Sequence, residues 1–188
     1  MRVSILAAFM VVALCALAAC GKPAPTSGPL AASQVPHRKA GLWREVKGID
    51  GAAPAGPGTQ LCVDDDVSNA RMAAFVQRTP GAPRCSSQYT RNLDGSISAS
   101  TSCDTGKYGK AVTTSVTKGD FNSSYTATTD TQLSGSPVAG LNGDHKTTII
   151  ATWLGPCAPG QRVGDIILPD GTKRNILDAL TATPSAGN

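Results

Sequence analysis

The segment from Cys85 to Cys103, CSSQYTRNLDGSISASTSC, constrains the fold more than any other part of the chain. Its centre, Asn92–Gly95, predicts a turn, because Asp favours turns and Gly supplies the positive φ that a three-residue loop with a bulge requires. In the register that this loop sets, Tyr89 lies opposite Ala99 and Cys85 lies opposite Cys103. The segment therefore predicts a β-hairpin whose strands are joined by a disulfide between these two cysteines.

The two faces of this hairpin differ in polarity. Tyr89, Ile97 and Ala99 share one face, whereas the other face carries serine, threonine and glutamine side chains. An antiparallel sheet with one face on the core and the other in water shows this alternation. We therefore expect a half-buried sheet with a polar outer surface.

The N-terminus has the pattern of an export signal. Arg2 supplies a positive charge, and Val3–Ala19 is almost entirely apolar. A transmembrane helix is the alternative, but about 17 residues lie at the lower limit for spanning a bilayer. The sequence Leu17–Cys20 resembles the lipobox of bacterial lipoproteins, which implies that residues 1–19 are a signal peptide and that the Cys20 thiol is lipidated.

Lipidation implies a location. A lipoprotein cysteine that carries diacylglycerol and palmitate is held permanently on a membrane, because one acyl chain alone gives only marginal binding. Gly21 stands where an Asp would resemble an inner-membrane retention signal. The sequence therefore predicts a lipoprotein on the outer membrane that faces the periplasm.

Cys62 and Cys157 are left once the hairpin cysteines are paired. Four cysteines in an exported chain indicate two disulfides, so elimination pairs Cys62 with Cys157 and closes a loop of about 95 residues. A metal site would need closely spaced ligands such as C-x2-C, and the sequence has none. No metal site is predicted.

The composition of the chain after Cys20 predicts a tether, a domain and a tail, and its charge bears on the type of partner. Residues 20–39 are predicted to be a lipidated, proline-rich tether, because proline disfavours regular helix and central strand. Residues 40–180 are predicted to form one disulfide-bonded domain, and the small, polar residues 181–188 a flexible tail. The net charge of +4 is weak and no basic stripe interleaves with aromatic residues, so no nucleic-acid partner is expected.

Periodicity and turn signals place the first elements of the domain. Strands are predicted at Leu42–Lys47 and Thr59–Val63, followed by a helix from about Asp66 to Arg78 with Asp64 or Asp65 as its N-cap. The apolar stripe of that helix comprises Met72, Phe75 and Val76.

A second hairpin is predicted with Lys118-Gly119 as a two-residue turn. That register places Val116 opposite Phe121 and Val112 opposite Tyr125, so that apolar residues match one another. Lys146–Leu154 has apolar residues on both faces and predicts a central strand. Asp165–Leu168 is a further short strand, and Thr172–Leu180 contains a helical turn.

Together these elements predict an α+β domain. It has a mostly antiparallel β-sheet of about seven strands, one or two short helices and two disulfides. An open barrel with a helix against it is the other arrangement that fits these elements.

Several short motifs occur in a specific order. They are Gly41–Trp43, Leu61–Val63, Cys85, Cys103, Leu154–Cys157 and Gly164-Asp165. This set, over about residues 40–168, resembles the domain-of-unknown-function family numbered 3617, found in exported proteins and lipoproteins of proteobacteria. The resemblance implies that Trp43 and the four cysteines form the structural frame, and it implies no catalytic residue.

Residues with catalytic or binding chemistry are sparse. His37 and His145 lie in linker and turn sequence and are expected to be solvated rather than catalytic. Asp64–Asp66 lacks the ligand spacing of a calcium loop and fits a helix cap. Trp43 and Trp153 suit either the wall of a ligand cleft or the core, and the core is favoured. No catalytic residue and no cofactor are predicted.

The leading hypothesis is a non-catalytic, lipid-anchored envelope protein whose sheet binds a small ligand, a glycan or another envelope protein. A concave apolar pocket beside the tryptophans would favour a small ligand, and a flat polar sheet would favour a protein. A lysozyme-inhibitor-like role within this class is an analogy only. The alternative is a hydrolase that uses carboxylates, Glu45 with Asp130 or Asp144.

Overall fold

The computed structural model of the 188-residue chain describes residues 26–79 and 82–180. The predicted signal peptide, the predicted lipidation site Cys20, the first part of the predicted tether and the predicted tail lie outside the described residues. Among the described residues no helix is long and apolar enough to cross a bilayer.

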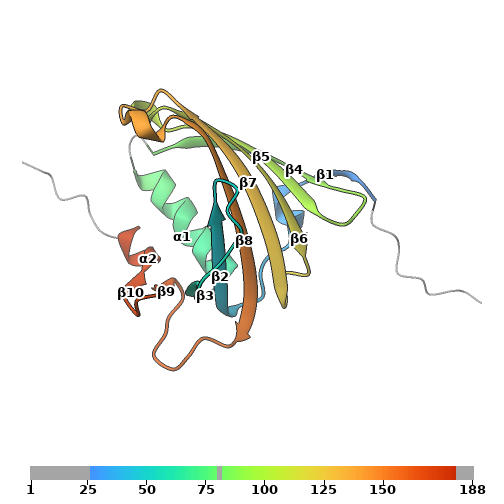
Figure 1. The fold of residues 1–188 in the computed structure, drawn as a ribbon, viewed down its shortest axis with the longest axis vertical. Coiled ribbons are helices and arrows are strands. Elements are labelled where there is room, and N and C mark those ends of the chain that lie inside the picture. Colours follow the sequence, from blue (N-terminus) through green and yellow to red (C-terminus); the bar gives the residue numbers. More distant parts are fainter. Residues whose placement is uncertain (1–25, 80–81, 181–188) are drawn as a thin grey trace, which may run out of the picture.

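In the described residues, ten antiparallel strands form one open sheet in the order β1-β4-β5-β6-β7-β8-β2-β3-β9-β10 (Figure 1). The prediction of a mostly antiparallel sheet with few helices and two disulfides is confirmed, but the expected number of about seven strands is wrong. The sheet is open rather than closed into a barrel. The strands missed at its two ends, β1 (Gly28–Leu30) and β10 (Lys173–Asn175), have three residues each, too few to show an alternating pattern.

Part of the predicted tether is folded onto the sheet. β1 lies within residues 20–39 and pairs with β4 (Arg84–Arg91), and a 3₁₀ turn follows at Ala32–Gln34. Pro29 fits this strand because β1 is at the sheet edge, where a missing N–H breaks no ladder. Folded structure therefore begins before the predicted domain start at residue 40.

The first hairpin has the predicted register. β4 pairs with β5 (Ile97–Asp104) so that Tyr89 lies opposite Ala99 and Cys85 lies opposite Cys103. The disulfide joins these two cysteines, with 4.1 Å between their Cα atoms.

The second hairpin has a different register from the one predicted. β6 (Lys110–Gly119) and β7 (Ser124–Ser134) pair with Gly119 opposite Tyr125 and Val116 opposite Thr128. The turn is a loop over residues 120–123, in which the Asp120 carboxylate accepts hydrogen bonds from the backbone N–H groups of residues 122, 123 and 124. The resulting shift is an odd number of residues, so it moves Val116 from the core side to the solvent side.

The core lies on one face of the sheet, where β8 (Gly143–Gly155) sits between β7 and β2 (Gly41–Ile49). Trp43 and Ala151 are fully buried there, and Tyr125 packs against them. We call this the inner face; the outer face is the opposite one, which carries Val112, Val116, Asp130 and Lys146. The central position predicted for the β8 segment is confirmed.

The helix α1 (Asp65–Arg78) follows β3 (Thr59–Val63), and Asp64 caps it by accepting hydrogen bonds from two backbone N–H groups of its first turn. Figure 1 shows α1 beside the curved sheet. Its predicted apolar stripe is only partly covered, since Met72 and Val76 remain 48% and 44% exposed.

The C-terminal elements extend the sheet beyond β3. β9 (Asp165–Ile167) pairs with β3, and β10 leads into α2 (Ile176–Ala179). Asp165 is buried and hydrogen-bonded by Lys173, the Arg162 backbone N–H and Asn175, which lower its pKa to about 2. The second disulfide, Cys62–Cys157, ties β3 to the loop after β8 and has a Cα separation of 5.4 Å.

Candidate functional site

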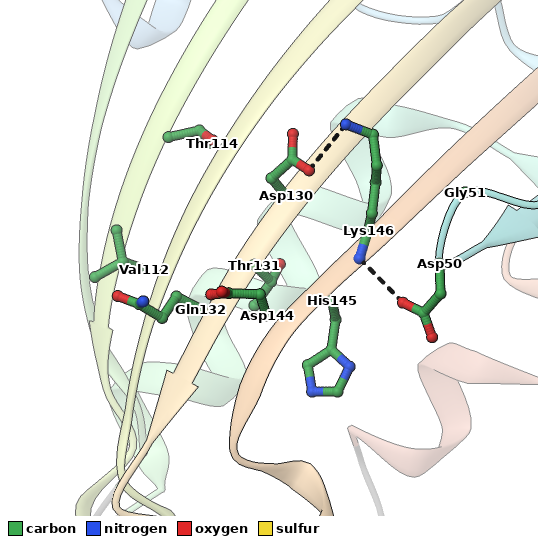
Figure 2. Close-up of a pocket in the computed structure, with 10 residues that line it drawn as sticks. All are labelled: Asp50, Gly51, Val112, Thr114, Asp130, Thr131, Gln132, Asp144, His145 and Lys146. Carbon is green, nitrogen blue, oxygen red and sulfur yellow. Dashed lines mark hydrogen bonds and ion pairs between the residues drawn. The ribbon is translucent and has the colours of Figure 1, made fainter.

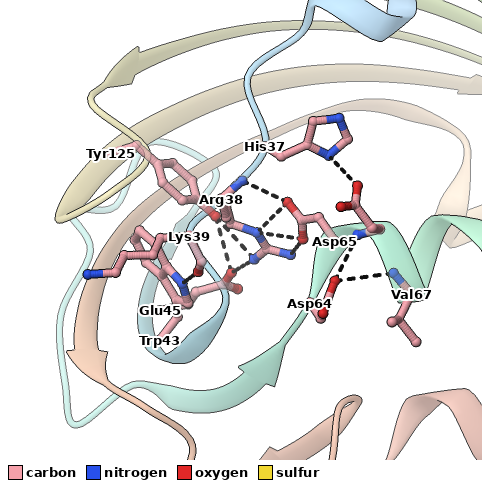
Figure 3. Close-up of polar contacts among 10 residues, drawn as sticks. His37, Arg38, Lys39, Trp43, Glu45, Asp64, Asp65, Val67 and Tyr125 are labelled. Carbon is pink, nitrogen blue, oxygen red and sulfur yellow. Dashed lines mark hydrogen bonds and ion pairs between the residues drawn. The ribbon is translucent and has the colours of Figure 1, made fainter.

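Two polar sites occupy opposite faces of the sheet. The first surrounds Arg38, which lies just before β2 in the segment predicted to be tether (Figure 3). Its guanidinium donates to Asp65 Oδ1 at 2.9 Å and to Glu45 Oε1 at 3.1 Å, and its backbone N–H donates to Asp65 Oδ2 at 2.9 Å. The Tyr125 hydroxyl completes the cluster by donating to Glu45. Arg38 thus joins the N-terminal segment, the first turn of α1 and strand β2.

The pairing of Arg38 with Asp65 favours the ionised forms of both side chains. Burial alone would raise the pKa of the Asp65 carboxyl, but hydrogen bonds from the Arg38 side chain and backbone outweigh it, so that pKa lies below its usual value. Burial alone would lower the pKa of Arg38, but the hydrogen bond with Asp65 and the nearby charges together outweigh it, so the pKa of Arg38 is raised. A guanidinium that already holds two carboxylates is a structural clamp rather than a vacant anion site.

Replacing Arg38 by methionine is expected to lower the free energy of unfolding at pH 7 by about 2 to 3 kcal/mol. The variant leaves Asp65 and Glu45, whose side chains are only 18% and 20% exposed, without a cation. Urea unfolding followed by circular dichroism measures the difference. An Arg44→Met variant, on an exposed position of β2, is the matched control and should change stability by less than about 0.5 kcal/mol.

The same comparison has a pH dependence. The pKa of Asp65 is lower in the folded state than in the unfolded state. The Asp65 carboxylate therefore contributes fully to stability above its unfolded pKa of about 3.9. This contribution is lost as the pH falls through the folded pKa. The stability difference between wild type and Arg38→Met should therefore shrink below about pH 4. An undiminished difference at that acidity would contradict the clamp.

The two tryptophans lie close to this cluster and play different parts. Trp43 is fully buried and donates from its indole N–H to the Lys39 carbonyl at 2.8 Å, which leaves it no surface for a ligand. Trp153 is half-buried, and the Lys39 ammonium lies 3.5 Å from the centroid of its ring. Trp43 therefore occupies the core, and Lys39 occupies the space over Trp153.

The second polar site is a groove of about 710 Å³ on the outer face (Figure 2). Strands β6, β7 and β8 form its floor, and the turn after β2, with Asp50 and Gly51, forms one wall. Asp130 and Lys146 form an ion pair of 3.2 Å across β7 and β8, and the Asp50 carboxylate accepts from the Lys146 backbone N–H. The remaining lining residues are Gly51, Val112, Thr114, Thr131, Gln132, Asp144 and His145.

Two further hollows lie on the same outer face. One of about 230 Å³ crosses β4, β5 and β6 and is lined largely by serine, threonine and glutamine side chains. The other, of about 370 Å³, lies at the end of these strands and includes Arg84, Asp104 and Lys110. The outer face from β4 to β8 is therefore a broad, shallow and polar surface rather than an enclosed apolar pocket.

The carboxylates of the hydrolase alternative are not brought together as predicted. Glu45 lies on the inner face, where Arg38 engages it, whereas Asp130 and Asp144 lie on the outer face. Neither pairing with Glu45 can act on one substrate across a sheet. Among the described residues, no group of three or more His, Cys, Asp or Glu side chains is arranged to hold a metal ion.

The histidines are not brought together either. His37 is about half exposed and lies 3.6 Å from the exposed Asp66. His145 was placed in a turn, but it lies in β8 at the rim of the outer groove, with Nε2 at 3.0 Å from the Leu141 carbonyl oxygen. β8 begins at Gly143, earlier than the apolar pattern indicates, because pairing with β7 continues through polar residues.

Sequence reasoning missed Arg38 and most residues of the outer groove. Arg38 stands in a proline-containing segment, and no local pattern indicates that its partner is Asp65. The groove residues lie on three strands and in the turn after β2, and only the polar alternation of the outer face pointed to them. That alternation predicted a solvated surface and not its hollow shape.

The fold places the protein in a structural class with a curved, open antiparallel sheet, two disulfides and a helix, α1, beside the sheet. The chain belongs to the family described as "Protein of unknown function (DUF3617)", whose model matches residues 38–157. The sequence resemblance is thereby confirmed. Comparison with curated proteins and with solved structures finds no match.

Proposed function

We propose that this protein is a non-catalytic binding module, lipid-anchored at Cys20 and facing the periplasm from the outer membrane, whose outer sheet face binds another envelope protein. The anchor rests on the lipobox-like sequence Leu17–Cys20. The observation that supports the binding role is the outer face itself, which has three shallow polar hollows side by side over β4–β8.

The shape of this face favours a protein over a small molecule. Small-ligand sites are concave, mostly apolar and bury most of the ligand. The outer face is open, and its side chains are mainly hydroxyls, amides and charges with isolated exposed valines at 112 and 116. Such a surface offers many hydrogen bonds over a wide area, as the polar part of a protein–protein interface does.

The charge of the main groove indicates the character of the partner. Asp50, Asp130 and Asp144 contribute three carboxylates, whereas Lys146 is the one lysine or arginine in its lining. Lys146 is already paired with Asp130. The groove therefore complements a basic patch on the partner, which would chiefly raise the rate of association.

Site-specific photo-crosslinking in the native envelope tests this function. A photoreactive side chain at position 114 or 132, both on the outer face, should yield one discrete protein adduct. The same side chain at exposed position 69 of α1 is the control and should not yield it. The adduct is identified by mass spectrometry, and the partner is then purified.

Direct binding of the purified partner completes the test. The double variant Asp130→Asn, Asp144→Asn should weaken binding about tenfold at low salt, through a slower association rate. The control Asp66→Asn removes an exposed carboxylate from α1 and should leave binding unchanged. The outer face would not be the docking surface if positions 69, 114 and 132 gave the same adduct in equal amounts. The same conclusion would follow if the double variant Asp130→Asn, Asp144→Asn bound the partner as tightly as the wild type.

A further inference from the structure

Strand β4 is only partly covered at the edge of the sheet. β1 pairs with Tyr89–Arg91 alone, so Arg84–Gln88 has no neighbouring strand on that side among the described residues. All five residues of this free segment are exposed. In an antiparallel ladder, alternate residues direct their N–H and C=O groups toward each side, so the segment presents unpaired backbone groups to solvent.

The free segment lacks the devices that usually protect a sheet edge. Proteins blunt such edges with proline, bulges, inward-pointing charges or very short strands. Arg84–Gln88 contains no proline, its ladder with β5 shows continuous register, and Arg84 is its one charged residue. The opposite edge, β10, has three residues and carries both Lys173 and Arg174.

A cationic hollow adjoins this free edge. Arg84 and Lys110 lie in it on either side of Asp104, across three paired strands. The ion pairs formed among the described residues involve neither cation. The hollow therefore has an excess of positive charge, which suits a carboxylate side chain.

We propose that the free edge of β4, Arg84–Gln88, receives an extended acidic peptide segment of another protein as an added strand in line with β1. The backbone of the segment pairs with β4, and a carboxylate of the segment contacts Arg84 and Lys110. β1 shows that this edge already accepts a short strand, here from the same chain. The proposal is independent of the outer groove, since strand addition takes place at the sheet edge.

Peptide binding to the mature full-length protein in detergent micelles tests the proposal. The probe is the acetylated octapeptide (Thr-Glu)4, which favours an extended conformation and places its carboxylates on one side. Fluorescence titration should give saturable binding, and hydrogen exchange should slow at the backbone amides of residues 84–88. The same octapeptide with every backbone nitrogen methylated keeps the charge but cannot pair, and should bind at least about tenfold more weakly.

Variants separate the charge contacts from general electrostatics. The double variant Arg84→Ala, Lys110→Ala should weaken binding of (Thr-Glu)4 about tenfold, whereas Arg174→Ala, which removes an exposed cation at the opposite edge, should leave it unchanged. Equal binding of the methylated peptide, or no slowing of exchange at residues 84–88, would overturn strand addition. Dimerisation without peptide, with exchange slowed at these residues, would instead identify a second copy as the occupant.

Discussion

Replacing both Cys62 and Cys157 by alanine is expected to lower the free energy of unfolding by about 4 to 5 kcal/mol. The disulfide spans a sequence separation of 95 residues, so its removal restores a large loop entropy to the unfolded chain. It also ties β3 to the loop after β8, and Cys62 itself is only 2% exposed. Urea unfolding at pH 7 under non-reducing conditions measures the change.

The hairpin disulfide is the matched control for this prediction. Cys85 and Cys103 close a sequence separation of only 18 residues, so the double alanine variant should lose about 3 kcal/mol. Its cysteines are also less buried than Cys62. If the hairpin variant proved the less stable of the two, the loop-entropy account of these bridges would be wrong for this protein.

Trp43→Ala is expected to lower the free energy of unfolding by about 3 to 5 kcal/mol. The Trp43 ring is fully buried, lies 5.5 Å from the Tyr125 ring between centroids, and packs in a small core. The loss of so large a side chain leaves a cavity that the few surrounding core residues cannot fill. Thermal unfolding and urea unfolding at pH 7 both measure this loss.

Two variants test whether burial is the cause. Trp153→Ala should cost less than Trp43→Ala, because Trp153 is half-buried and Lys39 covers its ring. Trp43→Phe keeps most of the apolar contact but removes the hydrogen bond to the Lys39 carbonyl, and should cost about 1 to 3 kcal/mol. Equal losses for the two alanine variants would contradict the assignment of Trp43 as the centre of the core.

Local signals explain why one hairpin was predicted correctly and the other was not. In β4–β5, the turn at Asn92–Gly95 and the alternation of both strands agree on a single register. In β6–β7, Lys118-Gly119 and the following Asp120 are competing turn signals within a few residues. The structure favours the loop closed by Asp120, and Phe121 stacks on Tyr125 there with φ of 59°. A match between apolar residues was therefore insufficient to set the register.

The site depended on long-range contacts that no local pattern contains. Arg38 meets Asp65 across 27 residues of sequence, and the backbone N–H of Lys146 meets Asp50 across 96. The outer groove exists because β2, β6, β7 and β8 become neighbours in the sheet. Its polar residues could be assigned to a solvated face in advance, but their convergence could not.

The sequence by itself determined interactions between residues a few positions apart: the β4–β5 turn and register, and an aspartate cap of α1 at position 64 or 65. Through the hairpin register it also determined the pairing of all four cysteines. It also determined the family. The tertiary structure alone decided the order of the strands, the pairing of β1 with β4, the Arg38 clamp and the hollow outer face. The physical reason is that turns and caps draw their energy from neighbouring residues, whereas sheet order and surface shape depend on which distant segments bury their apolar faces together.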